Sequence, residues 1–164
     1  MILPDHLAHG LDIVFCGTAA GTASARRGHY YAGPGNRFWP LLAETGLTPH
    51  ILRPEDDHLL PGLGLGLTDL AKTASGADAA IPSTAYDPAG LFARLAPLRP
   101  LALAFTSLTA ARLALGRPEA QAGCLQNDPR LPGCTLWALP SPSALAKSHF
   151  RSDPWYQLAA WRPA

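Results

Sequence analysis

The chain has 164 residues, of which 48% are hydrophobic and 15% are charged. This length and composition fit one compact domain with a real core and exclude two independent domains. The formal net charge of +1, from 13 Lys and Arg against 12 Asp and Glu, excludes a protein that binds nucleic acid through a global positive field. Any such contact must depend on local basic stretches.

The predicted elements alternate between strands and helices along the chain. Short apolar runs, each too short for an independent helix, predict buried strands at Leu11–Cys16, Leu65–Leu70, Leu101–Phe105 and Cys134–Leu139. Helical patterns lie between or after them, at Arg37–Thr45, Gly90–Leu98, Leu108–Leu115 and Trp155–Trp161. Asp87, Ser107 and Asp153 stand where the N-caps of the last three helices are expected.

This alternation predicts a single α/β domain over residues 1–164, a three-layer sandwich with a mostly parallel four-stranded central sheet flanked by helices. In such sheets ligands bind beyond the carboxyl ends of the strands. That rule points to the segments that follow the predicted strands, namely Gly17–Asn36, Asp69–Asp87, Thr106–Ser107 and Pro140–Lys147.

The cysteine count and the first residues set limits on cofactors and location. Cys16, Cys124 and Cys134 make an odd number without C-x-x-C spacing, which argues against a disulfide framework and a metal cage. The amino-terminal segment lacks the features of a secretory signal, and no run approaches the roughly 18 apolar residues of a membrane span. We therefore expect a cytoplasmic protein with no membrane partner, no metal and no organic cofactor.

Two stretches could supply a local basic surface. They are Arg26, Arg27, His29 and Arg37 near the amino terminus, and Lys147, His149, Arg151 and Arg162 near the carboxyl terminus. Taken alone, each stretch is better explained as an ordinary solvated face, because scattered Arg and Lys need no special explanation.

Two separated motifs are more specific. The predicted first strand ends in a turn of small residues, Gly17-Thr18-Ala19-Ala20-Gly21, which fits neither a phosphate loop nor a dinucleotide fingerprint. The block Pro34-Gly35-Asn36-Arg37-Phe38-Trp39 follows. The other motif, Leu139-Pro140-Ser141-Pro142-Ser143-Ala144-Leu145-Ala146-Lys147, lies near the carboxyl end. With these two motifs in this order along the chain, the sequence resembles the mismatch-specific uracil-DNA glycosylase and thymine-DNA glycosylase family. The resemblance extends over nearly the whole chain.

The resemblance implies roles for named residues. A uracil pocket would be formed by Gly17, Thr18, Ala19, Tyr31 and Asn36. An apolar wedge, Leu145, would enter the base stack, with Ala144 and Ala146 facing the widowed base, while Ser141, Ser143, Lys147 and His149 would contact phosphate.

Each role has a structural alternative. Leu145 could be an ordinary core residue and Tyr31 could merely pack its loop. Asn36 is first of all a helix cap, and Phe38 and Trp39 are better explained as core residues.

The turn departs from the family pattern at Ala19. In the resembling family an asparagine of G-I-N-P-G places the attacking water, and a methyl group cannot do so. Asp69, at the end of the predicted second strand, is the best replacement, because a carboxylate in so apolar a run is costly without a partner or a purpose. Its structural alternatives are capping the next turn or pairing with Lys72.

Other polar residues rank lower as catalytic candidates. Asp12 lies at the wrong end of its strand, Asp87 is a helix cap and Asp78 falls in a loop expected to be flexible. His29 and His149 are second-rank candidates for contacting uracil or phosphate.

The expected function is therefore a monomeric, monofunctional glycosylase that flips uracil out of DNA and leaves an abasic site. The small residues of the turn predict activity on U·G mismatches, extending to U·A pairs and single strands. The alternative is a protein that binds mismatched or abasic DNA with little or no catalysis, which Ala19 favours. A small-molecule hydrolase is disfavoured because the chain lacks a G-x-S-x-G elbow.

Overall fold

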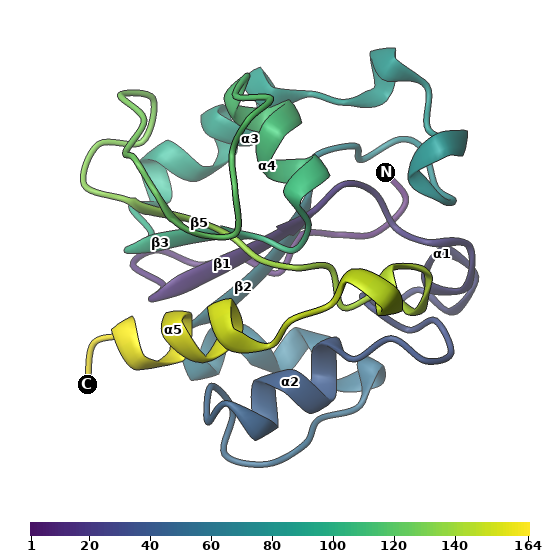
Figure 1. Ribbon diagram of the computed structural model, residues 1–164, viewed down its shortest axis with the longest axis horizontal. Helices are drawn as coiled ribbons and strands as arrows, with labels where there is room; N and C mark the ends of the chain where they lie inside the picture. The colour runs from purple at the N-terminus through teal and green to yellow at the C-terminus, as the bar shows by residue number, and fades with distance from the viewer.

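A computed structural model describes the backbone of residues 1–164 and every side chain except that of His149. Its centre is a five-stranded sheet in the order β2-β1-β3-β5-β4 (Figure 1). The strands are β1 (Ile13–Gly17), β2 (Leu65–Asp69), β3 (Ala102–Phe105), β4 (Gly123–Leu125) and β5 (Thr135–Ala138). The first four in spatial order pair in parallel, and β4 pairs with β5 in the antiparallel direction.

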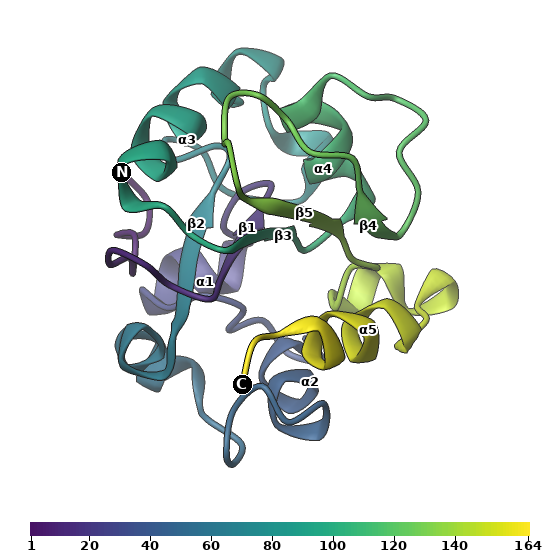
Figure 2. The same ribbon diagram turned by 90° about the vertical axis from the view of Figure 1, so that its left-hand side faces the viewer.

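Helices cover both faces of the sheet. The α-helices are α1 (Thr22–Arg27), α2 (Phe38–Glu44), α3 (Pro88–Leu95), α4 (Leu108–Leu115) and α5 (Asp153–Trp161). Short 3-10 helices connect them, namely η1 (Pro54–Leu63), η2 (Asp78–Ala80), η3 (Ser83–Ala85), η4 (Ala96–Leu98) and η5 (Ala144–His149). Figure 2 shows α2 and α5 on one side of the sheet and α3 and α4 on the other.

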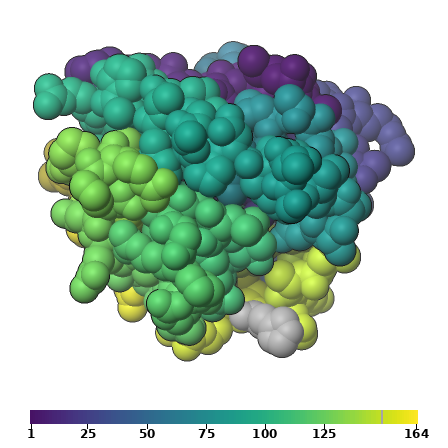
Figure 3. All heavy atoms as spheres, turned by 90° about the horizontal axis from the view of Figure 1, so that it is seen from above, coloured from purple at the N-terminus to yellow at the C-terminus, as the bar shows by residue number. Residues whose placement is uncertain are grey.

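The strand residues alternate between two cores. On β1, Ile13 and Phe15 pack with α2 and α5, whereas Val14 and Cys16 pack with α3 and α4. Both faces are buried because every strand residue of β1 is apolar up to Gly17. Figure 3 shows the molecule from the α3 and α4 side, where residues from the middle of the chain, in teal and green, form most of the surface.

The predicted three-layer α/β sandwich is confirmed, but the number of strands was wrong. The missed strand β4 has only three residues, and Cys124 at its centre is exposed. It therefore carries neither the buried apolar run nor the alternation that marked the other four strands. Helix α1 was also missed, because Ser24 is its only buried residue and it presents no apolar stripe.

Two of the three predicted N-caps are confirmed. The Asp87 carboxylate accepts a hydrogen bond from the Gly90 N–H at 3.0 Å, and the Ser107 hydroxyl accepts one from the Ala110 N–H at 3.0 Å. Asp153 is instead the first residue of α5, after Ser152. Caps followed by an apolar stripe could thus be located from sequence to within one residue.

The amino-terminal segment covers the exposed edge of β2. The Ile2 N–H donates to the Lys72 carbonyl at 2.8 Å, and His6 forms an antiparallel bridge with Leu67. An edge strand left open would offer unpaired backbone groups to other chains. Among the described residues, no helix is long and apolar enough to span a bilayer.

Candidate functional site

A cleft of about 890 Å³ opens at the carboxyl ends of the parallel strands. Its walls come from the segment after β1, the segment after β2, the first residues after β3 and the segment after β5. These are the four segments that the topology rule selected from the sequence. Figure 1 shows them meeting at the end of the sheet that carries α1 and the loop before α5.

Asp69 lies on the floor of this cleft. It is the last residue of β2 and pairs in register with Gly17, the last residue of β1. Only 4% of its surface is exposed. The expected alternative, an ion pair with Lys72, is wrong, because the Lys72 ammonium binds the Asp5 carboxylate at 2.6 Å.

Three oxygen atoms converge above Gly17. A Cβ built on this glycine would lie 2.9 Å from the Asp69 Oδ1 atom, 3.4 Å from the Thr106 hydroxyl and 3.4 Å from the Tyr31 hydroxyl. The Thr106 and Tyr31 hydroxyls are themselves hydrogen-bonded at 2.9 Å. The missing side chain therefore leaves a small space that three polar groups face.

The environment of Asp69 favours its neutral form. The pKa of its carboxyl group is raised from 3.8 to about 7, chiefly by burial; the Lys72 cation lowers it, the negative charge of Asp5 raises it and the Arg94 cation lowers it. A carboxyl group that changes charge near neutral pH inside a cleft is suited to proton transfer.

Tyr31 forms an aromatic wall of the cleft. Its backbone has φ of 52°, a left-handed conformation that costs a non-glycine residue on the order of 1–3 kcal/mol. The ring is held by stacking on Phe38, with centroids 3.9 Å apart and an interplanar angle of 19°. Phe38 is fully buried, so the expectation that it belongs to the core is confirmed.

The segment before Tyr31 is anchored from behind the cleft. The Asp57 carboxylate accepts a hydrogen bond from the Tyr30 N–H at 3.1 Å, and each of its oxygens lies 3.3 Å from His29 Nδ1. His29 is therefore turned toward a buried aspartate and does not line the cleft. Its second-rank assignment as a contact for uracil or phosphate is not supported.

Asn36 acts first as a cap, as expected. Its side-chain oxygen accepts a hydrogen bond from the Phe38 N–H at 2.9 Å at the start of α2, and it also lines the cleft. Ala19 lies half-buried in the cleft wall beside Thr18. The Thr18 hydroxyl donates to the Asp78 carboxylate at 2.7 Å.

Asp78, which was expected in a flexible loop, lies in a short 3-10 helix. It begins η2, lines the cleft and is tied to the first loop by Thr18, while the neighbouring Gly76 N–H donates to the Ala20 carbonyl at 2.9 Å. No sequence signal could show this contact, because Thr18 and Asp78 are 60 positions apart. Thr106 was also missed, although a hydroxyl directly after a predicted strand satisfies the rule that selected Asp69.

The segment after β5 forms the outer rim. Leu145 is 84% exposed, so the core alternative for this residue is wrong. Ser141 and Ser143 use their hydroxyls within the loop, accepting hydrogen bonds from the Ser143 and Leu145 N–H groups, each at 3.2 Å. Ala144 and Ala146 also line the cleft. Lys147 is exposed outside the cleft lining, and the side chain of His149 lies outside the described residues.

Arg37 connects this rim to the aromatic wall. Its N–H donates to the Pro142 carbonyl at 2.9 Å, and its guanidinium lies 3.8 Å from the centroid of the Phe150 ring. A guanidinium over an aromatic face contributes about 0.5–2 kcal/mol. Arg37 is therefore a structural link and not part of a free basic surface.

Three of the four residues of the first basic stretch have partners within the protein. Arg27 pairs with Glu55, His29 faces Asp57 and Arg37 packs on Phe150. In the second stretch, Arg162 pairs with Asp12 at 2.9 Å at the amino-terminal end of β1, far from the cleft rim. Arg151 remains at the cleft. Arg27, Arg37 and Arg162 are thus engaged in contacts within the protein and are not presented together as a basic surface.

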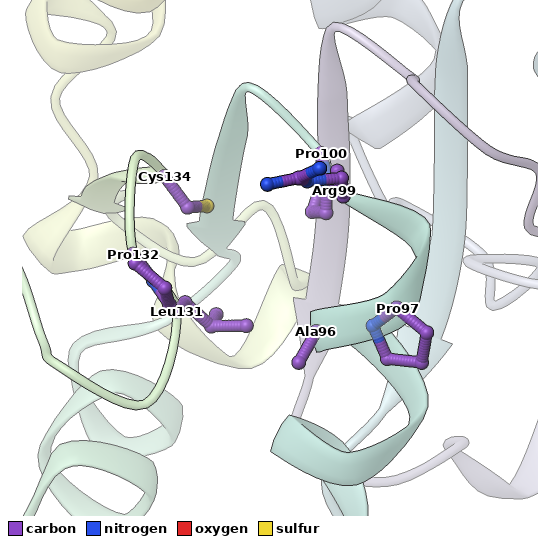
Figure 4. A pocket seen from close by; sticks show the side chains of 7 residues that line it. All are labelled: Ala96, Pro97, Arg99, Pro100, Leu131, Pro132 and Cys134. Atoms are coloured by element: carbon purple, nitrogen blue, oxygen red, sulfur yellow. The ribbon is translucent and has the colours of Figure 1, made fainter.

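A second hollow, of about 320 Å³, lies near the start of β3 and β5 (Figure 4). Figure 4 shows it lined by Leu131, Cys134 and three prolines, with Arg99 as the charged residue. Burial raises the pKa of the Cys134 thiol to about 12, so this thiol is not a ready nucleophile. Among the described side chains, no group of three His, Cys, Asp or Glu residues could hold a metal ion.

The fold is thus an α/β sandwich with a mostly parallel sheet, and its cleft, at the carboxyl ends of the strands, holds a buried carboxylate and an aromatic wall. Residues 4–164 match the model of the uracil DNA glycosylase superfamily, and the chain belongs to this superfamily. The fold is similar to a solution NMR structure from Methanosarcina acetivorans, described as a "putative Uracil DNA glycosylase". The TM-score is 0.65 at 20% identity, over 97% of this chain and 93% of that one.

Proposed function

We propose that the protein excises uracil from DNA and that Asp69 is its catalytic carboxylate. Membership of the superfamily supports DNA glycosylase activity in general. The observation that carries the finer proposal is the position of Asp69, buried on the cleft floor and paired in register with Gly17, two residues before Ala19. A polar group from the neighbouring strand thus lies at the start of the loop in which Ala19 supplies only a methyl group.

The chemistry requires a base and a stabilised cation. As the bond from sugar C1′ to uracil N1 breaks, its electron pair leaves with uracil and positive charge develops on the sugar. An ionised Asp69 would stabilise this cation and accept a proton from the water that forms the new bond to C1′. That proton then passes to the uracil anion, so no cofactor or external reductant is needed.

The rest of the cleft suits a flipped base. Tyr31, held rigid by Phe38, offers a stacking surface, and base stacking on an aromatic ring contributes about 1–3 kcal/mol. Leu145 projects from the rim, where it would fill the space that the base leaves. Ser141, Ser143 and Lys147 would contact the backbone next to this wedge. In this proposal Gly17, Thr18, Ala19 and Asn36 line the pocket around the base.

The function is tested by release of free uracil from U·G, U·A, T·G and single-stranded DNA. We expect release from U·G duplex, with U·A and single strands also cleaved because Thr18, Ala19 and Ala20 make a small pocket wall. Activity confined to U·G would contradict the broad range but leave uracil excision intact. No release from any uracil substrate would overturn the proposal.

Ala19 favours a second candidate, a protein that binds mismatched or abasic DNA without efficient excision. This candidate predicts tight binding to an abasic duplex together with no uracil release. The same panel of substrates therefore separates the two functions, provided that binding is measured alongside product formation.

Replacing Gly17 with alanine tests the space above the cleft floor. The new methyl group would lie 2.9 Å from Asp69 Oδ1, closer than real Cβ atoms approach an oxygen, so the carboxylate must shift. A displacement of about 1 Å can cost on the order of 100-fold in rate. We expect G17A to lose about this factor in single-turnover uracil release.

Gly21→Ala is the matched control. Gly21 has φ of −66°, and nothing lies within 4 Å of its added Cβ. We expect G21A to retain the wild-type rate. Equal rates for G17A and wild type would show that the Asp69 position above Gly17 does not matter for the reaction.

Leu145→Ala tests the wedge. Because Leu145 is 84% exposed, its truncation should change stability by no more than about 0.5 kcal/mol. Losing a wedge that compensates a flipping cost of a few kcal/mol should slow excision from U·G duplex about 10- to 100-fold. Single-stranded substrate, which has no stack to fill, should be cleaved at nearly the wild-type rate.

Ile51→Ala provides the comparison for this variant. Ile51 is 61% exposed and lies outside the cleft, so its truncation removes a similar apolar surface at a distance. An equal loss on duplex and single strands in L145A would argue against the wedge.

A further inference from the structure

Two cations near Asp69, Lys72 and Arg94, do not pair with its carboxylate. Lys72 lies three residues further along the chain, and Arg94 on α3 donates from Nη2 to the Asp69 backbone carbonyl at 3.1 Å. Either side chain would be an ordinary partner for a buried carboxylate. Among the described side chains, however, neither makes an ion pair with Asp69.

Both cations are bound by one residue of the amino-terminal segment, Asp5. Its Oδ1 atom lies 2.6 Å from the Lys72 ammonium, and its Oδ2 atom lies 3.1 Å from Arg94 Nε. The Arg94 Nε contact is an ion pair without hydrogen-bond alignment. Oδ1 also accepts a hydrogen bond from the Thr68 hydroxyl at 2.7 Å, directly before Asp69 in β2.

We propose that Asp5 is a positioning residue for the reaction, which holds the Lys72 ammonium and the Arg94 guanidinium and so keeps both from forming an ion pair with the Asp69 carboxylate. This inference rests on the proposed function, in which Asp69 reacts. An Asp69 paired with either cation would be a weaker base and a permanently charged one. Asp5 thus leaves the carboxylate free to exchange a proton near neutral pH.

The other titratable groups around Asp69 stay neutral. Burial raises the pKa of the Cys16 thiol on β1 well above its ordinary value, and it does the same for the Tyr30 and Tyr31 hydroxyls. The charged groups that act on Asp69 are therefore Asp5, Lys72 and Arg94. Burial is the largest cause of the raised pKa of Asp69; Lys72 and Arg94 lower this pKa, and the charge of Asp5 offsets part of that lowering.

Asp5→Asn tests this arrangement by two measurements. The first is the titration of the Asp69 carboxyl carbon by ¹³C NMR, assigned by comparison with D69N. The second is the pH dependence of single-turnover uracil release. Removing the charge of Asp5 should lower the midpoint of both curves by about 1 pH unit. The released Lys72 and Arg94 cations could then pair with Asp69, and an opposite charge nearby shifts the pKa of a carboxyl group by roughly 1–3 units.

A lower midpoint increases the ionised fraction of Asp69 in mild acid. The rate at pH 6, relative to the plateau at high pH, should therefore rise about fivefold in D5N. Structural damage would lower the rate at every pH and would not produce this relative gain. Asp5→Glu, which keeps the charge, should stay close to the wild-type midpoint.

Asp12→Asn is the matched control, because it breaks an aspartate–arginine pair at the opposite end of the strands. Its Asp69 midpoint should equal that of the wild type. A D5N protein that folds but keeps the wild-type midpoint, or moves to a higher one, would overturn the proposal.

Lys72→Met gives a second test that does not depend on the folding of D5N. Lys72 lowers the pKa of Asp69 even while Asp5 holds the ammonium, so the Asp69 midpoint should rise in K72M, but by less than about 1 pH unit because the two groups do not pair. A rise of about 1 unit or more would show that Lys72 acts directly on Asp69 and would contradict the role of Asp5. If the wild type releases no uracil, the proposed function fails, whereas the NMR titration still decides whether Asp5 controls Asp69.

Discussion

Asp69→Asn should slow the chemical step of uracil excision by about 10²- to 10⁴-fold, the range that a positioned acid–base group contributes. The amide has almost the same shape as the carboxylate but can neither accept the proton of water nor stabilise a cation by its charge. Binding to an abasic duplex should be kept, because the rim and the aromatic wall are unchanged. Single-turnover kinetics and a binding titration measure the two effects separately.

The pH dependence provides an independent check on this prediction. With a pKa of about 7 for Asp69, the ionised form gains population as the pH rises from 6 to 8, so the wild-type rate should rise over this interval. D69N should show a flat, low rate over the same interval.

Asp78→Asn is the appropriate control, since Asp78 is also an aspartate lining the cleft and hydrogen-bonded to Thr18. We expect D78N to lose much less activity than D69N. The reverse order would transfer the catalytic role to Asp78.

The Asp69→Asn substitution should also make the protein more stable than the wild type at alkaline pH. The folded protein binds the proton of Asp69 more tightly than the unfolded chain does, since the pKa is about 7 instead of 3.8. The stability associated with protonated Asp69 is therefore complete below pH 3.8 and is lost as the pH rises through about 7. The full difference corresponds to about 4 kcal/mol.

An asparagine at position 69 stays neutral and avoids this loss. D69N and wild type should unfold at similar urea concentrations at pH 4, whereas at pH 8 D69N should be more stable by about 2–4 kcal/mol. Comparing the two proteins at each pH cancels the titration of all other groups, including Asp128, whose pKa Arg130 lowers to about 2. A constant difference between pH 4 and pH 8 would mean that burial does not control the protonation of Asp69.

The sequence predicted the layers and the place of the cleft because both depend on local patterns. The apolar runs of β1, β2, β3 and β5 fill a sheet that is buried on both faces, and the topology rule then selects the loops that follow them. Asp69 could be recognised as a polar residue at the end of such a run. Short, partly exposed elements such as α1 and β4 carry no comparable pattern.

The contacts that tune the site were beyond sequence patterns. Lys72 is near Asp69 in sequence, yet its partner is Asp5, 67 positions away. Thr18 and Asp78 meet in the same long-range manner. Likewise, Arg27 and Arg37 looked like members of a basic surface, but the fold brings Glu55 and Phe150 to them. Such pairings depend on which loops the fold places side by side.

The empty space above Gly17 has a consequence for related sequences. An acid at the end of β2 and a side chain at the end of β1 compete for the same volume, since Asp69 Oδ1 would be 2.9 Å from a Cβ at position 17. The two positions should therefore vary together during divergence. A relative that carries any larger residue at 17 must draw its catalytic group from another strand end, and glycine at 17 is a precondition for an acid at 69.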